Sequence, residues 1–170
     1  MQRSDPRTSA CIRARAAGAI RGLLLWPATA ISIGCGGDEP VARVGDLVIT
    51  RAVAPAPVGD GPAALYFTVV NRGSAADTLV TVATPAAAEA MVHDQVRRGG
   101  SMTMEHVGAL AVPAGDSVRL APGGLHVMLS GRRTPITAGD TLQVTLTFRR
   151  AGVVALRVPV VTYSELDGRT

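Results

Sequence analysis

Alternation of apolar and polar residues is the main pattern from Val41 onward, and it predicts a chain of short β-strands. The clearest case is the stretch 141–149, TLQVTLTFR, where Leu142, Val144, Leu146 and Phe148 share one face and polar residues share the other. Further strands are expected at 42–54, 64–70, 78–84, 92–96, 102–107, 109–112, 117–120, 125–129 and 152–161.

Turn signals separate these strands, and they define the fold class. Gly, Pro, Asn and Asp recur about every ten residues, and no long helical pattern interrupts them. The alanine-rich stretch 86–91 could form one helical turn, although a strand is favoured. Pro159 places the strand at 152–161 at a sheet edge. We therefore predict an all-β fold, a sandwich or Greek-key barrel, with a frayed end from residue 164.

The N-terminal region has the pattern of an export signal. Residues 1–21 are rich in arginine, residues 22–34 are apolar, and Cys35 follows. The apolar run is shorter than the roughly 20 residues that cross a bilayer. The segment 32–35, Ser-Ile-Gly-Cys, resembles a bacterial lipobox, although leucine is usual where Ser32 stands. We expect a lipoprotein signal peptide over 1–35 with Cys35 as the candidate lipidation residue; the alternative is plain secretion.

Domain organisation follows from this leader. Residues 36–41 are expected to be a polar tether, 42–163 a single β-sandwich domain and 164–170 a C-terminal tail. The protein is then exported to the periplasm or the outer face of the cell envelope, and only a lipid anchor would attach it to a membrane.

Charge and cysteine content narrow the range of possible functions. Beyond Cys35 there are twelve arginines and twelve acidic residues, so the expected mature part is neutral and gives no electrostatic reason to bind nucleic acid. That part also contains no cysteine. A disulfide, a thiolate metal ligand and a nucleophilic thiol are therefore excluded from it.

Histidine and methionine are concentrated in one segment. All three histidines and four of the five methionines lie between residues 91 and 128: Met91, His93, Met102, Met104, His106, His126 and Met128. Imidazole nitrogen and thioether sulfur are ligands for soft or borderline metals, copper above all. Taken singly, a methionine in a strand is more often core filling and a histidine more often a hydrogen-bonded surface residue.

Strand periodicity groups these side chains. Residues i and i+2 point to the same face of a strand, which pairs Met91 with His93 and His126 with Met128, and aligns the donors of the 102–107 strand. Residues 125, 127 and 129 then face a core. The Pro-Gly-Gly loop at 122–124 fixes the position of His126.

The spacing of four of these residues resembles a known family. His93, Met104, His126 and Met128 reproduce the pattern H-x10-M-x21-H-x-M of the periplasmic copper chaperones of the PCuAC type. The stretches 64–73 (ALYFTVVNRG), 120–131 (LAPGGLHVMLSG) and 135–148 (PITAGDTLQVTLTF) are similar to further segments of that family. The resemblance covers about residues 41–161.

The resemblance implies a cupredoxin-like β-sandwich that binds one Cu(I) through His93, Met104, His126 and Met128. Met91 and Met102 would be nearby spare donors, and His106 lies outside the pattern. It also implies a monomeric, non-catalytic carrier that delivers copper to an acceptor, in this family the dinuclear copper centre of cytochrome c oxidase, or to another copper carrier. A C-terminal His/Met-rich extension, which some relatives have, is not seen, so a second copper site is not expected.

Three other functions compete with this one. A blue-copper electron carrier would need a cysteine ligand, which the domain lacks. A copper enzyme would need an open, histidine-dominated site, to which His106 could contribute. A structural or interaction lipoprotein without metal is the remaining alternative. A measurement of copper binding distinguishes it from a chaperone.

Overall fold

Residues 39–166 are described by a computed structural model, and almost all of their regular structure is β. The strands are β1 (Pro40–Val44), β2 (Leu47–Pro55), β3 (Ala63–Asn71), β4 (Asp77–Ala83), β5 (Ala87–Arg98), β6 (Ser101–His106), β7 (Leu110–Val112), β8 (Ser117–Leu120), β9 (His126–Arg132), β10 (Thr141–Phe148) and β11 (Gly152–Val161). One helical turn, α1 (Tyr163–Leu166), follows. The predicted all-β fold is confirmed.

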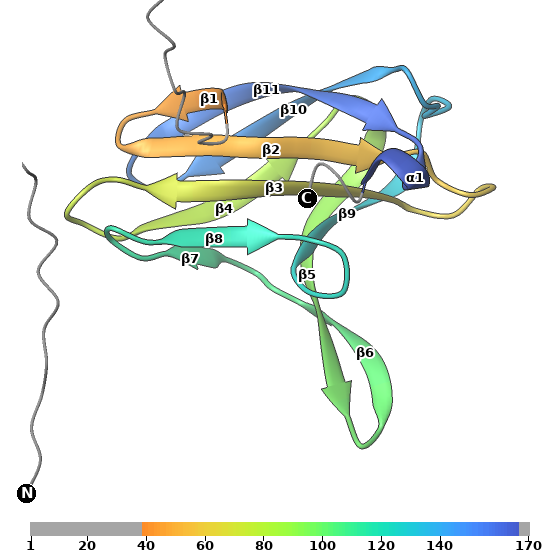
Figure 1. Cartoon of the computed structure of the whole chain (residues 1–170), viewed down its shortest axis with the longest axis horizontal. Helices are drawn as coiled ribbons and strands as arrows, with labels where there is room; N and C mark the ends of the chain where they lie inside the picture. The colour runs from red at the N-terminus through yellow and green to blue at the C-terminus, as the bar shows by residue number, and fades with distance from the viewer. Residues whose placement is uncertain (1–38, 167–170) are drawn as a thin grey trace, which may run out of the picture. The chain divides into compact units, whose positions relative to one another are not determined.

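A single folded sheet connects these strands in the order β6-β5-β9-β3-β2-β11-β10-β4-β7, with β1 added to β2 and β8 to β3. All pairings are antiparallel except that of β11 with β2. Strand β3 is the branch point, because its first residues pair with β9 and its later residues pair with β8. At one end of the order, the β5–β6 hairpin extends beyond the neighbouring strands (Figure 1).

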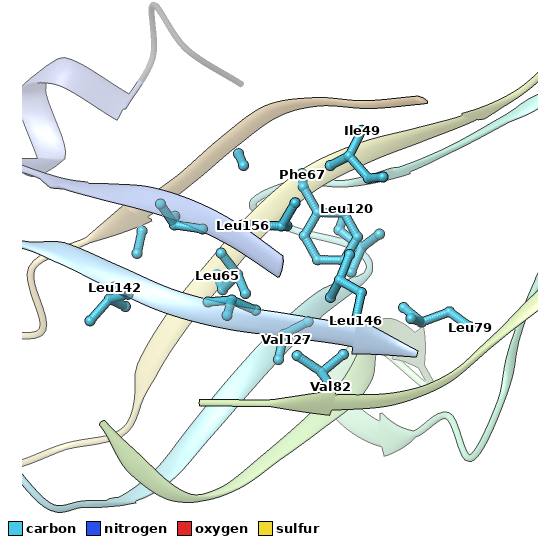
Figure 2. Packing of buried hydrophobic residues seen from close by; sticks show 14 of the residues in the cluster. Ile49, Leu65, Phe67, Leu79, Val82, Leu120, Val127, Leu142, Leu146 and Leu156 are labelled. Atoms are coloured by element: carbon cyan, nitrogen blue, oxygen red, sulfur yellow. The ribbon is translucent and has the colours of Figure 1, made fainter. Parts of the chain in front are cut away.

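The core lies between the two layers that this folding produces. Ile49, Phe67 and Leu120 from β2, β3 and β8 meet Leu146 and Leu156 from β10 and β11, and all five are at most 2% exposed (Figure 2). The alternating face predicted for 141–149 points into this core, since Leu142, Val144, Leu146 and Phe148 are all buried. Burial of aliphatic side chains from both layers is the main stabilising contribution.

The prediction of one strand over 42–54 is wrong, because the chain reverses at Gly45. Strands β1 and β2 form a hairpin in which Val44 pairs with Leu47 across a two-residue turn. Gly45 has a positive φ of 53°, a conformation that glycine adopts without steric cost. The turn signal is a single glycine inside an otherwise apolar alternation, which explains why the sequence pattern reads as continuous.

Residues 87–91 of the alanine-rich stretch belong to a strand, as favoured, and not to a helical turn. Strand β5 runs without interruption from Ala87 to Arg98, with β9 on one side and β6 on the other. The ladder that Ala87–His93 form with β9 outweighs the helical preference of alanine, which is worth only a few tenths of a kcal/mol per residue. This long strand brings the histidine and methionine segments together.

The prediction that 152–161 forms an edge strand is wrong. Strand β11 lies between β10 and β2 in the sheet order. Its ladder with β2 consists of Val160 and Val161 alone, so Pro159 precedes that ladder and its missing N–H does not disturb it. The chain after β11 also differs from a frayed end as far as Leu166, which is 4% exposed and packs with Val53 and Tyr66.

Two buried polar side chains tie the loops to the sheets. Asn71 donates through Nδ2 to the carbonyl oxygens of Ala75 (2.9 Å) and Val112 (3.2 Å), and its Oδ1 accepts from the Gly73 N–H (3.0 Å). Gly73 itself approaches Asp46 so closely that a Cβ would lie 2.6 Å from Oδ2. Asn71 therefore holds the β3–β4 loop against β7.

Asp77 performs the same task for the β10–β11 turn. Its Oδ1 accepts from the N–H groups of Thr78 (2.7 Å) and Arg150 (2.9 Å), and its Oδ2 accepts from Ala151 (2.8 Å). Burial by itself would raise the pKa of this carboxyl, but the three N–H donors and the Arg150 charge hold it below the usual value.

The expected signal peptide over 1–35, Cys35 and most of the tether 36–41 lie outside the described residues. Within 39–166 the structure has no helix with the length and apolar character that crossing a bilayer requires.

Candidate metal centre

Three adjacent strands bring all three histidines onto one face of the sheet. In the centre, His93 of β5 lies directly opposite His126 of β9 on one side and directly opposite His106 of β6 on the other. Directly opposed residues of an antiparallel ladder project to the same face. The ring centroid of His93 is 6.1 Å from that of His126 and 5.6 Å from that of His106. The three imidazoles thus form a row across the strands.

The methionines occupy the same face in the neighbouring rows. Met91 of β5 pairs with Met128 of β9, one row from the histidines on one side. Met104 lies on β6 one row from the histidines on the other side, opposite Gln95, and Met102 lies a further row out. The sequence prediction that the three segments are neighbours with one His/Met face is confirmed, and all seven candidates share that face.

The opposite face of these strands is part of the core. Val127 and Leu129 of β9 are completely buried, and Val92 of β5 is 7% exposed. Leu125 is partly buried and also packs against the core, as predicted. The His/Met face is therefore mounted on a strand pair whose other side is anchored by close packing, and such rigid elements position ligands more accurately than loops do.

His126 has one ring nitrogen fixed by the backbone. Its Nδ1 lies 2.9 Å from the carbonyl oxygen of Gly124. Because a carbonyl only accepts, Nδ1 carries the proton and donates, which leaves Nε2 with a free lone pair. Metal-binding histidines are commonly oriented in this way by a hydrogen bond from the second ring nitrogen. The Pro-Gly-Gly loop predicted to position His126 supplies this acceptor.

His93 differs, because its buried Nδ1 has no hydrogen-bond partner. The residue is 8% exposed, and a buried polar atom without a partner costs free energy unless a water molecule or a metal ion satisfies it. Burial, followed by the nearby rings of His106 and His126, lowers the pKa of His93. The backbone of Met91 has a smaller effect in the opposite direction and raises this pKa, although it is not placed to be a hydrogen-bond partner of Nδ1. His93 is therefore a neutral imidazole at physiological pH.

Exposure increases across the face from β9 to β6. His126 and His93 are 7% and 8% exposed, whereas Met102 and Met104 on β6 are 48% and 56% exposed. His106 is exposed as well, while Met91 and Met128 are partly buried. The candidate site thus has a buried side at β9 and an open side at β6.

The position of β6 is fixed by a tight turn. Gly99 and Gly100 have φ values of 56° and 87°, and Arg98 pairs with Ser101 across them. Positive φ at both central residues is the requirement of the two-residue hairpin turn that suits twisted strands. An ion pair between Arg98 and Glu105, with Nε 2.6 Å from Oε1, also joins the two strands.

Sequence reasoning missed the contact between His93 and His106, although a signal for it exists. A two-residue Gly99-Gly100 turn places Arg98 opposite Ser101. Counting away from the turn along both strands then places His93 opposite His106. The Gly124 carbonyl was also missed, since backbone acceptors carry no sequence signal. In residues 39–166 no group of three or more His, Cys, Asp or Glu side chains is arranged to hold a metal ion. The donors on this face are imidazoles together with thioethers.

The fold and the His/Met face define the class of protein. It is a small β-sandwich domain with a mixed imidazole and thioether site at one end of its sheet. The chain belongs to the family described as "Putative lipoprotein LpqE-like", whose model matches residues 47–160. It is 31% identical over 159 residues to the "Putative lipoprotein Lxx21020" of Leifsonia xyli subsp. xyli (strain CTCB07), an alignment that covers 93% of this chain and 94% of the relative.

Solved structures with a similar fold include PCuAC domains. The copper-bound PCuAC domain from PmoF2 has a TM-score of 0.62 and 28% identity, over 71% of this chain and 97% of that domain. The solution structure of CuI-DR1885 from Deinococcus radiodurans has a TM-score of 0.55 and 28% identity, over 72% of this chain and 81% of that protein. The resemblance to the PCuAC type and the expected cupredoxin-like sandwich are therefore confirmed.

Proposed function

We propose that this protein binds one Cu(I) ion through His93, His126, Met104 and Met128 and carries it to an acceptor. The observation that supports this most directly is the pairing of His93 with His126. One ring has a buried nitrogen without a partner, and the other has its Nδ1 held by Gly124 so that Nε2 is free. Met128 lies one row from both rings on the same face, and Met104 one row away on the other side.

The donor set suits Cu(I) more than other ions. Two thioethers and two neutral imidazoles are soft, uncharged ligands, which favour Cu(I) over Zn(II) or Cu(II). Thioethers bind without losing a proton, so only the histidines exchange protons for metal. The low pKa of His93 keeps that ligand unprotonated. Copper bound in the solved relatives PmoF2 and DR1885 adds support from the same fold.

A carrier role fits the exposure of the site. Met104 is 56% exposed, so one ligand is within reach of another protein, while the two histidines are shielded. Met128 also lines an open groove of about 660 Å³ with Ser130 and Pro135. We propose the dinuclear copper centre of cytochrome c oxidase as the acceptor, with another copper carrier as the alternative. The protein is proposed to transport the ion without catalysing a reaction.

The proposed location is the outside of the cytoplasmic membrane. The segment that ends at Cys35 acts as a signal peptide of the lipoprotein type with cleavage before Cys35, and the lipid on Cys35 anchors the protein to the cell envelope. The lipoprotein descriptions of the family and of the Leifsonia relative support this. Mass spectrometry of the mature N-terminus tests it: a diacylated cysteine is expected, and an unmodified N-terminus produced by cleavage elsewhere would contradict it.

Competition with a chromogenic Cu(I) chelator under reducing conditions tests copper binding itself. We expect the protein to withdraw one equivalent of Cu(I) from the coloured complex. A protein that leaves the chelator fully loaded over a wide concentration range would refute the chaperone function and favour a structural lipoprotein. Co-purification of the loaded protein with an oxidase copper subunit tests the acceptor separately.

A further inference from the structure

His106 is the one histidine of the described residues that the proposed copper site leaves unused, although it is the nearest imidazole to His93. The centroid separation of 5.6 Å is shorter than the 6.1 Å between His93 and His126. Metal–nitrogen bonds of about 2 Å allow the ring centres of two imidazoles on one ion to lie up to roughly 6 Å apart. Both separations are close to this span, so small side-chain movements let His93 share an ion with either neighbour.

His93 is therefore central to two donor groups on one face. On the β9 side it has His126, which is buried, and Met128, which is partly buried. On the β6 side it has His106 and Met104, which are both exposed. His106 and Met104 are two residues apart on one strand and project to the same face as His93.

Open space adjoins His106. A cavity of about 260 Å³ between β4 and β5 is lined by His106 together with Met91 and Val80. Such a volume admits an ion with water, or a ligand from another molecule. By contrast, the Nδ1 of His126 is held by a hydrogen bond to the carbonyl oxygen of Gly124 in the Pro-Gly-Gly loop.

From these positions we infer a second, outer station for copper, formed by His93, His106 and Met104, through which Cu(I) enters and leaves the inner site. This inference rests on the proposed copper function and adds the route of exchange. His93 and Met104 remain bound throughout. As copper moves outward, the His106 nitrogen forms a bond while the bonds to His126 and Met128 break, and the ion stays Cu(I). The shift exposes copper to a partner ligand without leaving it free in solution.

Copper in the outer station has three ligands, one fewer than in the inner site, and is therefore an intermediate of low coordination number. Direct release from the inner site would break the bonds of copper to His126 and Met128 with no replacement donor from this chain. A replacement imidazole offsets part of the lost bonding, so the barrier to exchange is lower while the equilibrium affinity, set by the inner site, changes little. His106 is thus a kinetic residue and not a member of the resting ligand set.

Stopped-flow removal of Cu(I) from the loaded, full-length protein by an excess of chromogenic chelator tests this. His106→Ala should release copper about tenfold more slowly, a barrier increase of roughly 1.4 kcal/mol, with its equilibrium affinity close to that of the unmodified protein. Met102→Leu is the matched control, because Met102 lies on the same strand two rows from the histidines and should leave the rate unchanged. An unchanged rate in His106→Ala would overturn the outer station.

A double variant separates this inference from the proposed function. In His126→Ala, the outer station should retain weakened binding of one Cu(I), and adding His106→Ala should abolish it. Equal residual affinity with and without His106 would overturn the outer station, while leaving the inner site intact. Failure of the unmodified protein to bind Cu(I) at all would instead refute the copper function itself.

Discussion

His93 and His126 face each other across the β5–β9 ladder, with ring centroids 6.1 Å apart and planes tilted by 32°. Both rings are shielded from solvent although they project away from the core. The ladder fixes their separation through backbone hydrogen bonds, and the packing of Val92 and Val127 on the reverse side keeps that ladder in place. A pair of imidazoles is thus held ready for an ion before any ion binds.

Replacing a proposed ligand should weaken Cu(I) binding without unfolding the protein. We expect Met104→Leu and His126→Ala each to reduce the affinity at least about 10- to 100-fold, the range found when the support of a metal site is lost. Chelator competition measures the affinity, and circular dichroism checks the fold. Met102→Leu is the control, since it removes a thioether of similar exposure from the same strand. Wild-type affinity in Met104→Leu would show that the ligand set is wrong.

Copper affinity should fall as the solution is acidified, because a protonated imidazole cannot bind a metal. An ordinary histidine has a pKa of about 6.5, and burial beside two other imidazoles holds that of His93 lower. Protons therefore compete with copper for His93 only at pH values below the ordinary pKa of a histidine. Chelator competition between pH 8 and pH 5 measures this, with the chelator's own pH dependence subtracted. An affinity that stays constant over that interval would argue against histidine ligands.

Asp77→Asn should destabilise the protein by about 1–3 kcal/mol. The Ala151 N–H now donates to a carboxylate oxygen, and in the variant it would face the amide nitrogen of asparagine, which is also a donor. Urea unfolding at neutral pH measures this loss. Asp116→Asn is the control, since Asp116 is exposed and its carboxylate accepts from the N–H of the adjacent Ser117.

The same carboxyl should make stability depend on pH. The folded-state pKa of Asp77 lies below the unfolded value of about 3.9, so its contribution is complete above that value and is lost as the pH falls through the folded pKa. Unfolding free energies should therefore decline with acid more steeply in the unmodified protein than in Asp77→Asn. Parallel curves for the two proteins would contradict this assignment.

Asn71→Ala should cost about 2–3 kcal/mol of stability, since it leaves the buried carbonyl oxygen of Val112 without its side-chain donor and removes the acceptor of the Gly73 N–H. The measurement is again urea unfolding. Because Asn71 lies on β3 far from the histidine row in the register, Cu(I) affinity at neutral pH should be unchanged. A large loss of affinity would show that the β3–β4 loop controls the site.

Amino-acid order by itself determined most of the strands. The alternation in 141–149 reappears as β10 with its four apolar side chains buried, and the stretches 64–70 and 117–120 reappear as β3 and β8. Local patterns succeed here because period-two alternation and turn residues act within a few positions of each other. They failed at Gly45, where one glycine turn divides an otherwise continuous apolar alternation, and at Pro159, where the order of strands in the sheet and not local preference decided the outcome.

The candidate donors were likewise all present in the sequence, and the spacing singled out four of them. Only the tertiary structure decided how they meet. Strand register placed His93 between His126 and His106, because pairing on both sides of β5 is a long-range property that no local pattern contains. Packing of the reverse face then decided which donors are shielded and which are exposed. Residue types thus set the chemistry of the site, and the register of three strands set its geometry.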